Sequence, residues 1–135
     1  MTLGADLAAA LPELRAEAES LMLDTCTVSP VTGVDESTGA PTPGTAVYAG
    51  RCRFQTTEVQ VSEPEAGGAT YTVLSGRLHV PVAAFANPAP GVDLVASCVT
   101  SANNPNLPGR MFRVTGPSPA KSLPTADRLP IEEVR

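Results

Sequence analysis

Few residues in this 135-residue chain could take part in chemistry, and they lie far apart. His79 is the only histidine, so a Ser-His-Asp triad or a multi-histidine metal site would need residues from another chain. Cys26, Cys52 and Cys98 lie in β-prone segments, which is typical of small buried residues rather than reactive thiols. Their odd number and wide spacing indicate neither a disulfide framework nor a CxxC metal site.

The remaining motifs give no reactive constellation either. Glu132 and Glu133 are adjacent, and adjacent residues on a strand point to opposite faces, so they do not form a carboxylate pair. The Gly67-Gly68 pair belongs to neither a GxxxxGK[ST] nor a GxGxxG pattern. We therefore expect no catalytic, cofactor-binding or metal-binding residues, no cofactor and no enzymatic activity.

Charge and hydropathy disfavour two further classes of protein. The formal net charge is −5 and only 4% of the residues are aromatic, whereas nucleic-acid-binding proteins use basic surfaces and aromatic stacking. A small nucleic-acid-binding barrel is thus a disfavoured alternative. No apolar run is long enough to span a bilayer, and no cationic segment precedes the first apolar residues. We expect a protein of the cytoplasm with no membrane contact.

The elements that must position any site are one helix followed by many short strands. Leu11, Leu14, Ala18 and Leu21 recur at helical spacing. Pro12 suits the first turn of a helix over 12–22, and it would equally end or kink a helix that began at Asp6. We therefore predict a helical segment over 1–23. Its apolar stripe and acidic outer face suit packing on the rest of the chain, or docking on a neighbouring protein.

Residues 24–135 predict a mainly β domain. Gly and Pro account for 25 of the 135 residues and fall between apolar runs, a pattern typical of many turns. The expected strands cover 24–29, 46–55, 70–82, 93–100, 111–115 and 129–134, with long loops at 30–45 and 56–69. A small antiparallel β-barrel fits best, because closure protects the edges of a sheet whose core is mostly Val and Ala.

Alternation within two of these strands predicts which side chains face inward. Val47, Cys52 and Phe54 are the expected inward residues of 46–55, on either side of a break at Gly50. In 70–82, Leu78, Val80 and Val82 share the inner face, and His79 lies on the polar face. Gly76 is expected to bend this strand.

A resemblance to a known family is carried by several short segments in a fixed order. They are NPNLPGRMFRV at 104–114, KS at 121–122 and TADRL at 125–129, preceded by LHVPV at 78–82 and GVD at 91–93. In this order the chain resembles the small head-to-tail connector proteins of long-tailed actinobacterial phages, in the head-completion or stopper class. Eight Arg against one Lys, together with abundant Ala, Gly, Pro and Val, agree with a GC-rich genome.

The resemblance implies a structural virion protein of the phage neck, assembled in the host cytoplasm. Such a protein forms a homo-oligomeric ring, a hexamer, below the portal and adaptor ring. It closes the DNA channel and offers the attachment surface for the tail terminator or tail tube. Genome DNA faces its lumen without specific binding. A tail terminator or another ring protein of the tail tube is the alternative.

The resemblance also directs attention to the loop at 56–69 as a channel plug. Folded as a hairpin, its 14 residues would reach roughly 23 Å at about 3.3 Å per residue. Its carboxylates would repel DNA in the lumen, and its two glycines would act as hinges. The loop at 31–45 is the rival plug. The candidate channel-loop residues are Glu58, Glu63, Glu65, Gly67 and Gly68.

Overall fold

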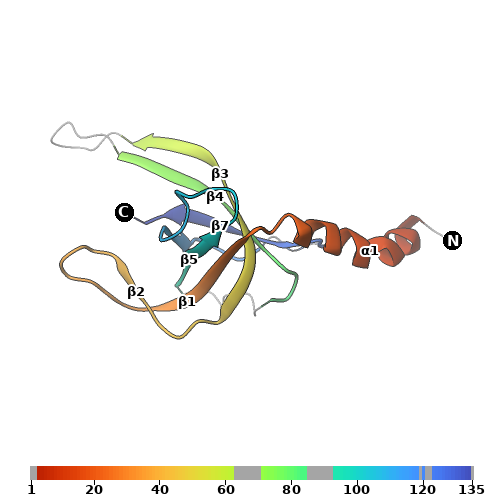
Figure 1. Cartoon of the computed structure of the whole chain (residues 1–135), viewed down its shortest axis with the longest axis horizontal. Coiled ribbons are helices and arrows are strands. Elements are labelled where there is room, and N and C mark those ends of the chain that lie inside the picture. Colours follow the sequence, from red (N-terminus) through yellow and green to blue (C-terminus); the bar gives the residue numbers. More distant parts are fainter. Residues whose placement is uncertain (1–2, 63–70, 85–92, 119, 121–122, 135) are drawn as a thin grey trace.

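The residues that the structure describes form one N-terminal helix and seven strands (Figure 1). The computed structural model describes residues 3–62, 71–84, 93–118, 120 and 123–134, with the backbone alone at 57–62 and 71–73. The elements are α1 (Leu3–Ser20), β1 (Asp24–Val34), β2 (Pro41–Pro43), β3 (Tyr48–Ser62), β4 (Tyr71–Val80), β5 (Leu94–Ser101), β6 (Met111–Val114) and β7 (Asp127–Glu133).

Six of the strands close into an antiparallel barrel. The order is β1-β3-β4-β7-β6-β5, and β5 pairs back with β1 to complete the circle. β2 is an outer strand that pairs only with the end of β1. Closure leaves no free edge among the six strands, as expected for a thin core. The predicted small β-barrel with an N-terminal helix is confirmed.

The core fills the barrel with side chains that alternate along the strands. Leu78 and Val80 are buried on β4, as the alternation predicted. The ring of Phe112 is completely buried and lies 5.1 Å from the ring of Phe54, centroid to centroid. Cys52 is buried and Phe54 packs against the core, so two of the three inward predictions for β3 are confirmed.

Two details of the strand predicted over 46–55 are wrong. Val47 is 49% exposed and lies just before β3. The strand also runs through Gly50 without a break, because Gly50 is held in the ladder opposite Cys26. A Cβ at Gly50 would lie 2.8 Å from the hydroxyl oxygen of Tyr48. Glycine at this position therefore leaves room for the Tyr48 side chain, whose hydroxyl donates to the carbonyl oxygen of Arg51 at 2.6 Å.

Both predicted long loops contain paired strands that extend beyond the barrel (Figure 1). Residues 31–34 prolong β1 and pair with β2, so the segment at 31–45 is largely a hairpin. Residues 58–62 of β3 pair with residues 71–75 of β4, from Glu58 opposite Ser75 to Ser62 opposite Tyr71. The two hairpins leave the barrel on the side away from α1.

The β3–β4 hairpin departs from the barrel at a bulge beside Gly76. Thr56 pairs with Gly76 and Glu58 with Ser75, so Thr57 is an extra residue on β3. A Cβ on Gly76 would overlap the carbonyl oxygen of Gln55 and lie 2.6 Å from the Cα of Thr56. The bulge therefore requires glycine opposite it. The predicted bend at Gly76 corresponds to this bulge in the partner strand.

α1 lies within the segment predicted as helical, 1–23, but it is longer than the helix predicted over 12–22. α1 begins at Leu3 rather than near Pro12, which lies inside it. Proline has no N–H, so the carbonyl of Ala8 receives no helical hydrogen bond from position 12. None of the residues of α1 is buried, and the helix points away from the barrel (Figure 1). The expectation that α1 packs along its own barrel is therefore wrong.

Candidate functional site

The three cysteines form part of the barrel core. Cys26 on β1 pairs in register with Cys98 on β5, and Cys52 lies on β3, the other neighbour of β1. All three are free and buried. Burial and the nearby Asp24 carboxylate raise the pKa of Cys98 to about 11, and a hydrogen bond with Cys26 raises the pKa of Cys52. Buried thiols enclosed in a core in this way are packing residues.

Labelling of the thiols tests this assignment. We expect the native protein to show no reaction with N-ethylmaleimide at pH 7, because the attacking species is the thiolate and none of the three sulfurs is accessible. Unfolding in guanidinium chloride should expose all three thiols to the reagent. Rapid labelling of one cysteine in the folded protein would show a reactive site that the packing argument excludes.

His79 lies among arginines on the outer face of the barrel. It pairs with Arg53 of β3 on one side and with Arg128 of β7 on the other, and Arg77 is two residues earlier on the same face of β4. Burial of the half-buried imidazole and the charges of Arg128, Arg53 and Arg77 lower its pKa to about 4. His79 is therefore neutral at pH 7.

The lowered pKa makes a contribution to pH-dependent stability. The unfolded state takes up a proton below pH 6.5 and the folded state only near pH 4, so the fold loses stability as the pH falls between these values. After allowance for solvent screening, the loss is about 1 kcal/mol. Urea unfolding of the wild type and His79→Gln from pH 7 to 4.5 should show this extra loss in the wild type only. Parallel curves would contradict the assignment.

The carboxylates at the end of β7 have structural partners. Glu133 forms an ion pair with Arg110, whose guanidinium carbon lies 5.8 Å from the centroid of the Phe112 ring. Glu132 lies directly opposite Arg113 of β6. Both glutamates border a pocket of about 250 Å³ that also touches the β1–β2 turn. The Glu133 carboxylate at this pocket is thus engaged by the guanidinium of Arg110.

The candidate channel-loop residues fall at and beyond the limit of the described structure. Glu58 lies on β3 opposite Ser75, immediately after the bulge. Glu63, Glu65, Gly67 and Gly68 lie outside the described residues. The structure therefore places Glu58 on the projecting hairpin, and the proposed roles of the other four stay predictions.

The described residues hold neither a metal-ligand cluster nor a membrane-spanning helix. No group of three or more His, Cys, Asp or Glu side chains in this part of the chain is arranged to hold a metal ion. α1, the one helix within the described ranges, lacks the length and apolar character needed to cross a membrane. The described part of the chain has three projections, namely α1 and the two hairpins. It also has a cluster of arginines around His79, formed by Arg53, Arg77 and Arg128.

Comparison with known proteins assigns the chain to a family. A family model described as a family of unknown function, DUF6093, matches residues 14–132, which run from the second half of α1 to Glu132, the residue before the end of β7. The chain belongs to the DUF6093 family. No curated protein and no solved structure gives a significant match to this DUF6093 protein.

The arginines around His79 are the feature of this DUF6093 protein that was not predicted from the sequence. Arg53, His79 and Arg128 are up to 75 positions apart, and only the register of β3, β4 and β7 brings them together. The alternation of Arg51 and Arg53 with buried Cys52 signalled an outward basic face on one strand. It gave no information about which strands lie beside it.

Proposed function

We propose that this DUF6093 protein is a head-to-tail stopper of a tailed phage. In this role a ring of subunits closes the DNA channel below the portal and adaptor ring and receives the tail. The observation that carries the proposal is the small closed barrel with a long, paired hairpin beyond its end (Figure 1). Together with the resemblance of its C-terminal third to stoppers, this supports an architectural role with no enzymatic step.

The β3–β4 hairpin is the better of the two plug candidates. Its arms pair over five residues each beyond the bulge, which is roughly 17 Å at about 3.3 Å per residue. The β1–β2 hairpin pairs over fewer positions, and its β2 strand has only three residues. A longer paired arm keeps its direction better, which a plug that must reach the centre of a channel requires.

The negative charge of the β3–β4 segment suits a surface that contacts DNA without binding it. Glu58, Glu63 and Glu65 belong to it, and a sixfold ring would bring eighteen such carboxylates around the lumen. Phosphates and carboxylates repel, so the plug would block DNA without holding it. We further propose that Gly67 and Gly68 let the tip move when the genome leaves.

A phage carrying a nonsense codon in this gene tests the function. We expect electron micrographs of its lysates to show emptied, tailless heads beside free tails, because the stopper both retains the genome and receives the tail. Supplying the intact gene from a plasmid should restore complete particles. Filled heads joined to normal tails would contradict the proposal. Tails of irregular length would instead indicate the alternative, a tail terminator.

A further inference from the structure

α1 carries an unpartnered ridge of leucines. At about 100° per residue, Leu7 and Leu14 of α1 and Leu21, which directly follows it, lie within roughly 40° of one another around the helix axis, and Leu3 lies beside them. Their side chains are between 39% and 75% exposed. We call these four residues the leucine ridge. An apolar stripe of this kind is normally buried against another surface, and the barrel of the same chain does not cover it.

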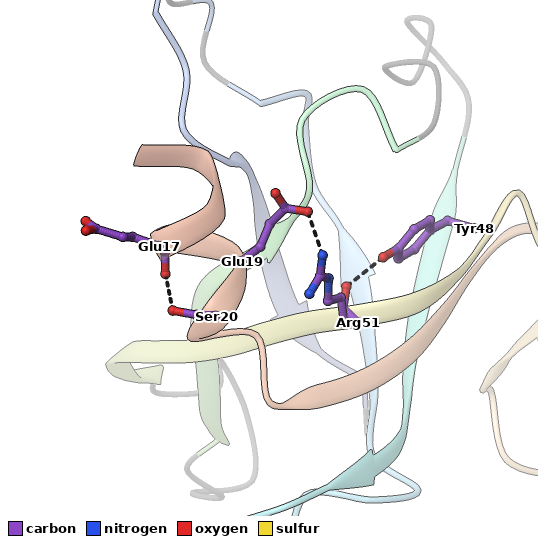
Figure 2. A network of polar contacts seen from close by, with 5 residues as sticks. All are labelled: Glu17, Glu19, Ser20, Tyr48 and Arg51. Atoms are coloured by element: carbon purple, nitrogen blue, oxygen red, sulfur yellow. Dashed lines mark hydrogen bonds and ion pairs between the residues drawn. The ribbon is translucent and has the colours of Figure 1, made fainter. Parts of the chain in front are cut away.

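The two borders of the leucine ridge differ. On one border, Arg15 donates from Nε to the carbonyl oxygen of Pro124 at 3.1 Å, and Glu19 forms a 3.0 Å ion pair with Arg51 of β3. These contacts hold the end of α1 to its own barrel. The other border carries Asp6, Glu13 and Glu17. Figure 2 shows the side chain of Glu17 pointing away from Arg51 and Glu19 pointing toward it.

The outer face of the barrel carries the complementary charge. Arg53, Arg77 and Arg128, which we call the arginine cluster, surround His79 on three adjacent strands. Within the described residues, none of the three forms an ion pair. The Asp24 and Asp127 carboxylates accept hydrogen bonds from the backbone N–H groups of Phe54 and Ala83. The cluster therefore carries three positive charges that no ion pair within the described residues neutralises.

The cluster and the acidic border lie at the same end of the molecule. Arg51, which holds Glu19 of α1, is two residues from Arg53 on the same face of β3. Glu13 and Glu17 belong to the half of α1 nearer the barrel. Two copies side by side would thus bring the acidic border of one helix level with the arginine cluster of the next barrel.

We propose that α1 of one copy docks on the arginine cluster of a neighbouring copy. Glu13 and Glu17 would meet Arg53 and Arg128, while Leu14 would lie on the apolar stems of the arginines. The two surfaces are different parts of the chain, so the contact is heterologous and builds a ring or an open chain. This contact rests on the proposed function, which requires a ring. Its test measures association between copies, whereas the test of the proposed function measures genome retention.

Charge reversal in the full-length chain tests the contact. We expect Glu13→Arg/Glu17→Arg and Arg53→Glu/Arg128→Glu each to weaken self-association at least tenfold in sedimentation velocity, with unchanged circular dichroism. An equimolar mixture should recover association, because the basic helix of the first variant matches the acidic face of the second. Arg53→Gln/Arg128→Gln is the milder variant if the reversal impairs folding. No loss in either variant, or no recovery in the mixture, would overturn the proposal.

Photo-crosslinking gives a second readout. Benzoylphenylalanine at position 14, on the leucine ridge, should crosslink to peptides of β4 and β7 from a ¹⁵N-labelled second copy. Position 16 is exposed on the opposite side of α1 and is the matched control. Crosslinks confined to one chain, or a wild type that stays monomeric at millimolar concentration, would overturn the proposal. The proposal would also be overturned if the arginine variants lost binding to duplex DNA while their self-association stayed unchanged. That result would indicate that the arginine cluster binds DNA phosphates.

Discussion

Removal of the β3–β4 hairpin beyond the bulge is expected to abolish genome retention while leaving the barrel folded. Residues 57–75 would be replaced by Asn-Gly, which joins the paired Thr56 and Gly76 through a two-residue turn. Among the described side chains, the buried core residues of β3 and β4 all lie on the barrel side of this junction. The melting temperature should therefore fall by only a few degrees, since one pairing with β7, that of Ser75, is lost.

The matched control removes the other hairpin. Replacing residues 32–42 by Asn-Gly joins Val31 to Pro43, which are paired in the same way. In a phage that carries each variant, we expect DNA-filled heads to disappear only when the β3–β4 hairpin is removed. Plaque titre should then fall by several orders of magnitude. Retention of DNA by the first variant and its loss in the control would assign the plug to the β1–β2 hairpin instead.

Gly76→Ala is expected to be among the most destabilising substitutions in the barrel. Its Cβ would overlap the carbonyl oxygen of Gln55, and backbone atoms move less readily than side chains. We expect a loss of about 2 to 4 kcal/mol in the free energy of unfolding, measured in urea. Gly33→Ala is the control, because no atom lies within 4 Å of a Cβ there. Equal stability of the two variants would contradict the close approach at the bulge.

Much of the fold follows from local pattern. Leu78 and Val80 alternate with His79, and all three residues occupy the predicted faces of β4. The barrel itself was predictable because short β-prone runs separated by Gly and Pro need closure to protect a thin core. The strand break predicted at Gly50 is wrong. Gly50 continues a strand because the ladder on β1 outweighs the weak preference of one glycine.

The errors concern features that depend on contacts outside the local sequence. Pro12 was expected to begin the helix, yet α1 continues for nine residues before it. The outer leucines of the helix suggested packing on the barrel, and periodicity alone does not say which surface covers an apolar stripe. The arginine cluster depends on strand order. Arg53 and Arg128 are separated by β4, a neighbour that no local spacing in the sequence reveals.

A density map of the neck of the virion tests the central claim most directly. It should contain a ring of these barrels between the adaptor and the tail, with the β3–β4 hairpins pointing into the channel below the last ordered DNA. Each helix α1 should lie against the adjacent barrel. Absence of the chain from the neck, or hairpins that point outward from an open channel, would contradict the account.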